Sequence, residues 1–210
     1  MISGILGRKM GMLQIFKEGK CISVTILHVG PCTVMQVKKP ETDGYCALQL
    51  GFDEKRVKST RRSELGHAKK HANTTPKKFI REVEWDGKDE IQPGQQINLT
   101  ILEKTKFVDI IGLNKGRGFQ GVMRRHGFKG EKKTHGQSDR WRAPGSIGSS
   151  AAPARVMKGK RMGGQMGHHR CTVRNLKVID IDLDKNYLAV NGSVPGMNGD
   201  YVIVARSVRG

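Results

Sequence analysis

The sequence has little of three things: aromatic side chains, long apolar runs and, over its middle third, acidic residues. Aromatic residues make up 5% of the chain and apolar residues 36%, which is enough for one modest hydrophobic core. No apolar run approaches the roughly 18 residues that a membrane-spanning helix needs. The first eight residues have the pattern of folded chain rather than of a secretion or transit signal. We therefore expect a cytoplasmic protein that does not enter a membrane.

Cysteine is also scarce, with four residues in a chain of 210. Cys21, Cys32, Cys46 and Cys171 are widely spaced, and no two of them form a Cys-x-x-Cys pair. This spacing favours reduced thiols over a disulfide framework or a zinc site. We predict no metal centre.

Acidic residues are scarcest between Thr105 and Asn175. The net charge is +6 for residues 1–104, +13 for residues 105–175 and zero for residues 176–210. A segment of this composition cannot bury enough apolar side chain to offset the entropy lost when it becomes ordered, so it requires a charged partner. The partner predicted is a polyanion, and RNA is the leading candidate.

Both ends of the chain are typical of β-structure, because short β-branched or alternating runs are separated by turn residues. One short helix is expected at 63–72. The expected strands are 10–16, 21–29, 33–37, 45–52, 79–85, 96–102, 107–113, 179–183, 187–190 and 201–205. The predicted fold class is mainly β, a small barrel or sandwich.

The segment 115–170 shows no convincing helix or strand and is rich in glycine. Compact domains rarely contain irregular connections longer than about 15 residues unless these are functional or disordered. We expect three parts: a β-barrel body formed by 1–54, 90–114 and 171–210, a small α/β insertion at 55–89, and a long basic, mostly irregular, RNA-threading extension at 115–170.

Basic and aromatic residues alternate along this extension. Arginine forks suit phosphate oxygens, and flat rings such as Phe119 and Phe128 can stack on unpaired bases. A merely solvated face would mix charges of both signs, and a membrane surface would call for an amphipathic helix that is not evident. The residues predicted to bind RNA are Lys115, Arg117, Arg124, Arg125, His126, Lys129, Lys132, Lys133, His135, Arg140, Trp141, Arg142, Arg155, Lys158, Lys160, Arg161, Arg170 and Arg174.

Other patterns point more weakly to other chemistry. Residues 116–121 match the GxGxxG dinucleotide fingerprint, but no apolar helix or βαβ alternation surrounds them. The pair His67 and His71 could share a helix face, and His168-His169 lies near Cys171, yet neither group has a full set of metal ligands. The aspartates at 180, 182 and 184 alternate with apolar residues, as on a solvent-facing strand. We predict no catalytic residues, no cofactor and no small-molecule substrate.

Several motifs resemble one family in order and spacing. They are ISGILGRKMGM, VDIIGLNKGRGFQGVMRRHGFKG, THG, PGSIGSSAAPARVMKGKRMGGQMG and VNGSVPG. Together they span essentially the whole chain, which is similar to the universal large-subunit ribosomal protein three family, bacterial type. The resemblance implies a translation-protein-type β-barrel with a small α/β insertion and a long loop threaded into large-subunit (23S-type) ribosomal RNA.

The resemblance also implies a function and a place for the loop. Family members bind this RNA directly, near its 3′ end, act early in subunit assembly and lie beside other large-subunit ribosomal proteins. The loop tip near the peptidyl transferase centre would be Gly148, Ser149, Ser150, Ala151, Ala152 and Pro153. The expected role is that of a structural constituent of the cytoplasmic ribosome, not an enzyme. The alternative is a general RNA-binding chaperone without a fixed ribosomal site.

Two positions depart from the family pattern. Members usually have Ser or Thr where this chain has Asn114, a small polar exchange that leaves the backbone logic intact. Some bacterial members carry a methylated Gln directly after Gly-Ser-Ile-Gly or two residues beyond. Because Ser149 and Ala151 occupy those positions here, this modification is not predicted.

Overall fold

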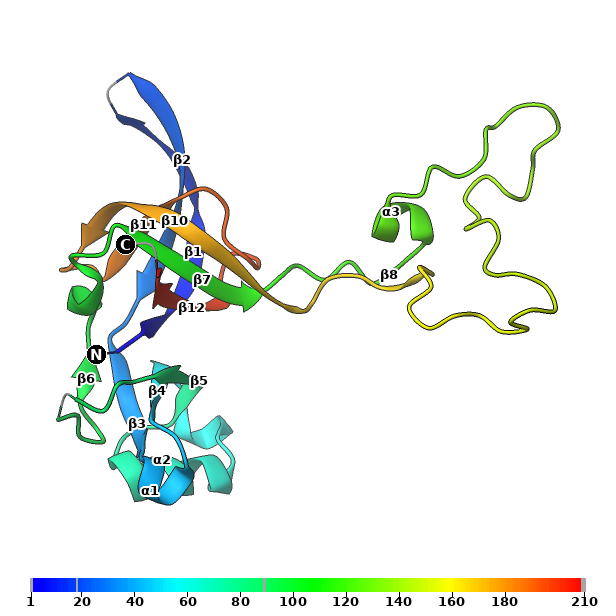
Figure 1. Ribbon diagram of the computed structural model, residues 1–210. Coiled ribbons are helices and arrows are strands. Elements are labelled where there is room, and N and C mark those ends of the chain that lie inside the picture. The colour runs from blue at the N-terminus through cyan, green and yellow to red at the C-terminus, as the bar shows by residue number, and fades with distance from the viewer. Residues whose placement is uncertain (1, 18, 89, 209–210) are drawn as a thin grey trace. The chain divides into compact units, whose positions relative to one another are not determined.

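The computed structural model describes residues 2–17, 19–88 and 90–208, and strands predominate, as the sequence predicted (Figure 1). Two compact units are present: a body formed by Met1–Asn114 with Arg170–Gly210, and a basic unit formed by Lys115–His169. The elements are β1 (Gly4–Lys17), β2 (Lys20–Val29), β3 (Cys32–Lys38), α1 (Pro40–Asp43), β4 (Ala47–Glu54), the 3-10 turn η1 (Val57–Ser59), α2 (Arg62–Ala72), β5 (Lys77–Glu84), β6 (Gln96–Ile97), the 3-10 turn η2 (Leu99–Leu102), β7 (Phe107–Leu113), β8 (Phe119–Gln120), α3 (Val122–His126), β9 (Gly164–Gln165), β10 (Arg170–Asp182), β11 (Tyr187–Asn191) and β12 (Tyr201–Arg206).

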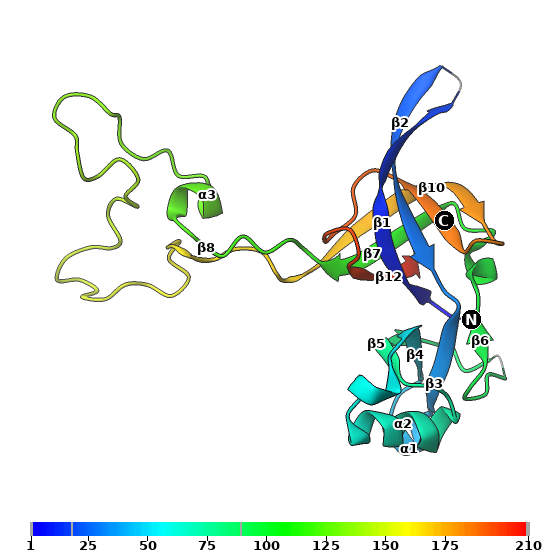
Figure 2. The same cartoon turned by 180° about the vertical axis from the view of Figure 1, so that it is seen from behind.

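The body is organised around a closed barrel with strand order β1-β12-β7-β10-β11-β2. All six pairings are antiparallel, so every barrel strand has a neighbour on both sides over part of its length. Alternation places one face of each strand inside: Val202 and Val204 of β12 are buried, and Ile203 between them is partly exposed. Figures 1 and 2 show the hairpin β1–β2 projecting beyond the other barrel strands.

A second sheet in the body has the order β5-β4-β3-β6. Residues 1–54 were all expected in the barrel, but β3 and β4 pair with each other and with β6 and β5. Gly30, which has φ +70°, and Pro31 separate β2 from β3. After this junction β3 leads away from the barrel (Figure 2). Alternation of apolar and polar residues indicates that a segment is a strand. Which strands it pairs with depends on junctions such as this one.

Helix α2 covers this sheet through Ala68 and Ala72, which are buried, and Thr74 just beyond it donates a hydrogen bond to the sulfur of Met35 on β3 (3.7 Å). The sheet is tied to the barrel by Asp53 of β4, which accepts a 2.9 Å hydrogen bond from the Tyr201 hydroxyl of β12. The second sheet and the barrel therefore belong to one folded body.

Two further expectations differ from the structure. The strand expected at 96–102 is only the two-residue β6, followed by η2, because Leu99 and Leu102 both become buried three residues apart on a 3-10 turn. The segment expected to lack elements contains β8, β9 and the short helix α3. Among the described residues, none of the helices is long and apolar enough to cross a membrane.

Candidate nucleic-acid interface

The two ends of the basic unit run beside each other as an antiparallel ladder. The Arg117 amide donates to the Met166 carbonyl (2.8 Å), and the Met166 amide donates to the Gly118 carbonyl (2.9 Å). β8 and β9 continue the ladder by pairing Phe119 with Gln165. The outgoing and returning segments therefore stabilise each other locally, without a hydrophobic core.

Glycine makes this ladder possible at one position in particular. Gly167 has φ +75°, and a Cβ atom placed there would lie 2.2 Å from the Lys115 carbonyl oxygen. Any other residue would force the two segments apart, because real Cβ atoms do not approach a backbone oxygen so closely. The glycine-rich composition thus serves contacts within the chain as well as any contact with a partner.

Helix α3 places several of the predicted cations. Val122 is buried, while Arg124 and Arg125 are exposed. Arg125 and His126 both hydrogen-bond the Met162 carbonyl, at 2.8 Å and 3.0 Å respectively, which fixes the helix against the returning segment. The helix is five residues long, so it organises side chains locally and does not form a core.

Trp141 is the centre of a second local structure. Its indole nitrogen donates to the Gln137 carbonyl, and the Glu131 amide donates to the Trp141 carbonyl (3.2 Å). The Lys133 ammonium lies 5.1 Å from the centroid of the ring, a cation–π distance. The ring is still 37% exposed, so one of its surfaces is accessible to a partner.

The predicted cations are almost all at the surface. His126 is partly buried, and the other seventeen predicted RNA-binding residues are exposed. The basic unit holds thirteen Lys and Arg against the two acids Glu131 and Asp139. Within the part of the chain that the structure describes, none of these thirteen cations forms a salt bridge. No described acid therefore pairs with these cations.

Two predicted residues and the predicted tip complete the set. Arg170 and Arg174 belong to the body, where they are exposed on β10. The tip residues 148–153 are all exposed, and the Ser146 hydroxyl donates to the Gly148 carbonyl (2.9 Å) just before them. The tip presents mostly backbone and small side chains, which suits close approach rather than side-chain chemistry.

The dinucleotide fingerprint has a different setting from the one it needs. The helix after Gly121 is the five-residue α3, and β8 pairs with β9 in an antiparallel manner. A dinucleotide fold requires a parallel sheet and a longer helix at this point. Gly116 and Gly118 instead lie in the antiparallel ladder of the basic unit, and Gly121 is the N-cap of α3.

The histidines and cysteines that could ligate a metal have other surroundings in the structure. The rings of His67 and His71 lie 5.0 Å apart, but His67 Nε2 is engaged with Gln49 Oε1 at 2.6 Å, and burial lowers the pKa of His67. Cys32 is buried beside the Leu6 carbonyl, and this burial raises its pKa to about 12. No group of three or more His, Cys, Asp or Glu able to hold a metal occurs among the described residues.

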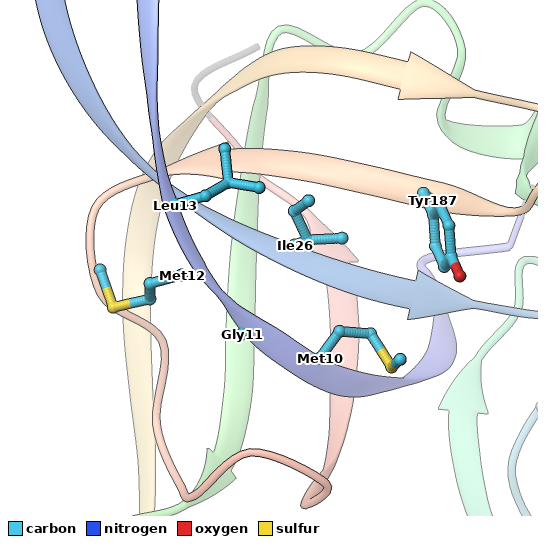
Figure 3. Close-up of a pocket in the computed structure, with 6 residues that line it drawn as sticks. All are labelled: Met10, Gly11, Met12, Leu13, Ile26 and Tyr187. Atoms are coloured by element: carbon cyan, nitrogen blue, oxygen red, sulfur yellow. The ribbon is translucent and has the colours of Figure 1, made fainter.

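One apolar hollow lies on the barrel, where Leu13 of β1 and Ile26 of β2 point to the same side as Tyr187 of β11 (Figure 3). Met10, Gly11 and Met12 complete its lining. Tyr187 is the only ionisable side chain among these six residues. Apart from the Tyr187 hydroxyl, these six residues offer an apolar surface without an acid, base or nucleophile.

The predicted set omits a group of cations on the body. Ten Lys and Arg and a single acid, Glu64, lie between residues 55 and 81, around η1 and α2. The sequence signal for these cations is the local excess of positive charge. It was overlooked because the excess in the middle of the chain is larger.

Comparison with known proteins agrees with the resemblance seen in the motifs. The family model described as Ribosomal protein L3 matches residues 78–186. The chain is 45% identical over 210 residues to the large ribosomal subunit protein uL3 of Bacillus thuringiensis (strain Al Hakam), covering 100% of this chain and 99% of that relative. The proteins of the same name from Bacillus mycoides (strain KBAB4) and Bacillus cereus (strain B4264) match with the same identity and coverage. The chain therefore belongs to the ribosomal protein L3 family.

Proposed function

We propose that the protein binds large-subunit (23S-type) ribosomal RNA directly through its basic unit, as a structural constituent of the large subunit of the cytoplasmic ribosome. As a member of a ribosomal protein family, it is a structural protein and not an enzyme. The observation that carries the proposal is the set of thirteen exposed Lys and Arg in residues 115–169 without a salt bridge among the described residues.

The mechanism follows from this charge. Each Lys or Arg that neutralises a phosphate releases condensed counterions, so affinity falls as salt rises. The exposed rings of Phe119 and Trp141 add stacking on unpaired bases as a secondary contribution. The narrow ladder and the glycine-rich backbone allow the basic unit to lie between RNA helices, where a bulky domain would not fit.

Three finer roles belong to the same proposal, and the motif resemblance supports them. The tip at 148–153 lies near the peptidyl transferase centre and braces RNA there, the protein acts early in subunit assembly, and the body contacts neighbouring large-subunit ribosomal proteins. The small, exposed tip residues support this role, because they permit close packing of backbone against RNA.

The test is a salt titration of binding to fragments of large-subunit ribosomal RNA and to length-matched control RNA. The full chain is compared with a variant in which a short turn replaces residues 115–169. Leu113 and Arg170 are paired across β7 and β10, so a hairpin turn can join these strands without changing the register of the barrel. We expect preferential binding of one ribosomal fragment, lost or greatly weakened in the shortened variant. Equal binding to every RNA would instead favour a general RNA chaperone.

A further inference from the structure

The body carries its own cationic surface, separate from the basic unit. We call it the α2 surface and define it by six exposed residues on η1, on α2 and directly beside them. They are Arg56, Lys58, Arg61, Arg62, Lys69 and Lys70. None of them belongs to the predicted RNA-binding set, which begins at Lys115.

The described acids leave these six charges largely uncompensated. The pKa of Glu64 is lowered mainly by its hydrogen bond with Lys55 and to a smaller extent by the charge of Arg61. The neighbouring cations are engaged: Lys55 with Glu64 (2.6 Å), Lys77 with Glu54 (3.2 Å) and Lys78 with Asp53 (2.9 Å). These pairs use the only acid within 55–81 and the two acids that directly precede it. For the six residues of the α2 surface, no salt bridge is present among the residues that the structure describes.

The helix separates a packed face from a charged one. Ala68 and Ala72 are buried toward the sheet. Arg62 and Lys69 are seven positions apart, so they project from the same side of the helix, about 10 Å apart along its axis. Two of the cations, Arg61 and Arg62, lie at the N-terminal end of the helix, where positive charge is unfavourable to the free helix. Helix stability does not account for this placement.

Gly66 gives an independent indication of a partner. It lies between Arg62 and Lys69 on the exposed side of α2, and a Cβ atom placed there would have nothing within 4 Å. Its backbone is helical, so no left-handed conformation requires glycine. Glycine weakens a helix interior relative to alanine. No contact among the described residues requires glycine at this position, whereas a partner whose backbone comes close to the helix would.

We propose that the α2 surface is a second RNA-binding site, which takes the sugar-phosphate backbone of RNA independently of the basic unit. The six cations contact phosphates, and Gly66 lets the backbone approach between Arg62 and Lys69. An acidic protein is a weaker match for this surface, because protein interfaces rely on large apolar or aromatic anchors. Val57 is the one large apolar residue that η1 and α2 expose.

The first test removes three charges from the full chain. The variant Arg62→Gln/Lys69→Gln/Lys70→Gln is compared with Lys104→Gln/Lys106→Gln/Lys177→Gln, which removes three exposed charges elsewhere on the body. Binding to large-subunit ribosomal RNA fragments is measured from 50 to 300 mM salt. We expect the salt slope to fall by about 2–3 in the α2 variant, at about 0.7–0.9 per lost contact, and to stay unchanged in the control.

The second test is a single substitution that should raise the stability of the free protein and lower its affinity for RNA. Gly66→Ala should raise the Tm of the free protein by about 1–4 °C, because alanine favours the helix. The same change should weaken RNA binding several-fold, because the added methyl group holds the RNA backbone away. Ser63→Ala, on the same helix, serves as the control and should leave RNA affinity unchanged. A rise in Tm without any loss of affinity would contradict close approach at Gly66.

The outcomes separate this proposal from the function of the basic unit. Equal salt slopes for the α2 variant and its control would overturn the α2 site, whatever the basic unit does. Polyglutamate serves as the probe for an acidic protein partner. If the α2 variant kept its RNA affinity but lost binding to polyglutamate, the surface would bind an acidic protein, and the RNA site would likewise be overturned. If the wild-type chain showed no preference for ribosomal fragments, the ribosomal role would fail. The difference in salt slope between the α2 variant and its control variant could then still be measured on control RNA, since phosphate contacts do not depend on sequence.

Discussion

The body and the basic unit use the same basic residues in opposite ways. In the body, Lys9 is only 6% exposed, and its ammonium donates to the carbonyls of Val194 (2.8 Å) and Gly196 (3.0 Å). In the basic unit, Lys160 is exposed and has no salt bridge among the described residues. The difference teaches that a lysine stabilises this fold where backbone carbonyls surround it. Where they do not, it is available to a partner.

The two units also differ in what holds them together. The body contains an apolar core that includes Leu27, Ile110 and Leu188, all fully buried. The basic unit is held by short backbone ladders and isolated side-chain hydrogen bonds, and Val122 is its one buried apolar side chain among the described residues. We therefore expect the units to respond differently to protease, mutation and pH.

The largest expected difference is in proteolysis. Trypsin should cut the free protein between Lys115 and Arg161 at least about 100-fold faster than in the barrel, because few buried contacts oppose local opening there. Bound ribosomal RNA should slow these cuts. Time-resolved digestion followed by mass spectrometry measures both rates. Equal cutting of both units would mean that the basic unit has a stability of its own.

The second largest difference is expected when an apolar side chain is shortened in each unit. Ile110→Ala in the barrel should lower the free energy of unfolding by about 2–5 kcal/mol, through lost burial and a cavity. Ile147 is 43% exposed, so Ile147→Ala should change it by less than about 0.5 kcal/mol. Urea unfolding followed by circular dichroism compares the two variants. A large loss for Ile147→Ala would reveal packing in the basic unit.

The two lysines give a third comparison. Lys9→Met should lower the free energy of unfolding by about 1–3 kcal/mol, because buried carbonyls lose their donor. Lys160→Met should leave stability unchanged and lower the salt slope of RNA binding by about 0.7–0.9. Thermal unfolding and RNA titration of both variants measure these effects. The distinction would be refuted if Lys160→Met destabilised the protein as much as Lys9→Met.

The smallest effect concerns acid stability. Partial burial opposes ionisation of Asp53, but hydrogen bonds from Lys78 and Tyr201 outweigh it and lower the pKa of the carboxyl. A lowered folded-state pKa contributes stability above the unfolded value of about 3.9, and this contribution is lost as pH falls through the folded value. In Asp53→Asn we expect a shallower loss of stability below pH 4, measured by denaturant unfolding at several pH values. A profile identical to that of the wild type would show that Asp53 contributes nothing.

Much of the fold could be predicted because alternation is a local property. The mainly β class is confirmed, and the strand expected at 107–113 has the bounds of β7. The assignment of β3 and β4 to the barrel was wrong, because strand partners depend on the junction at Gly30 rather than on the strand sequences. The ladder from Arg117 to Met166 escaped notice because its residues are about 50 positions apart and show no alternation.

The candidate site was predictable in part for a similar reason. Charge is visible in a sequence, so the exposed cations of the basic unit could be named in advance, and their contacts with RNA remain a prediction. Family membership was predicted from the motifs and is confirmed. The α2 surface was missed because its meaning depends on which neighbouring acids are already engaged. The structure shows that Glu64, the single acid of this segment, already forms an ion pair with Lys55.

The pairing of β7 with β10 has a consequence for the order in which the protein is made. The two strands are neighbours in the barrel, yet the whole basic unit, residues 115–169, separates them in the chain. At about 5–20 residues per second, its synthesis occupies about 3–11 s. During this interval the barrel lacks β10, β11 and β12, while the cationic segment is already emerging. Newly made protein can thus meet a polyanion before its barrel closes, so the timing of translation itself determines which of the two events comes first.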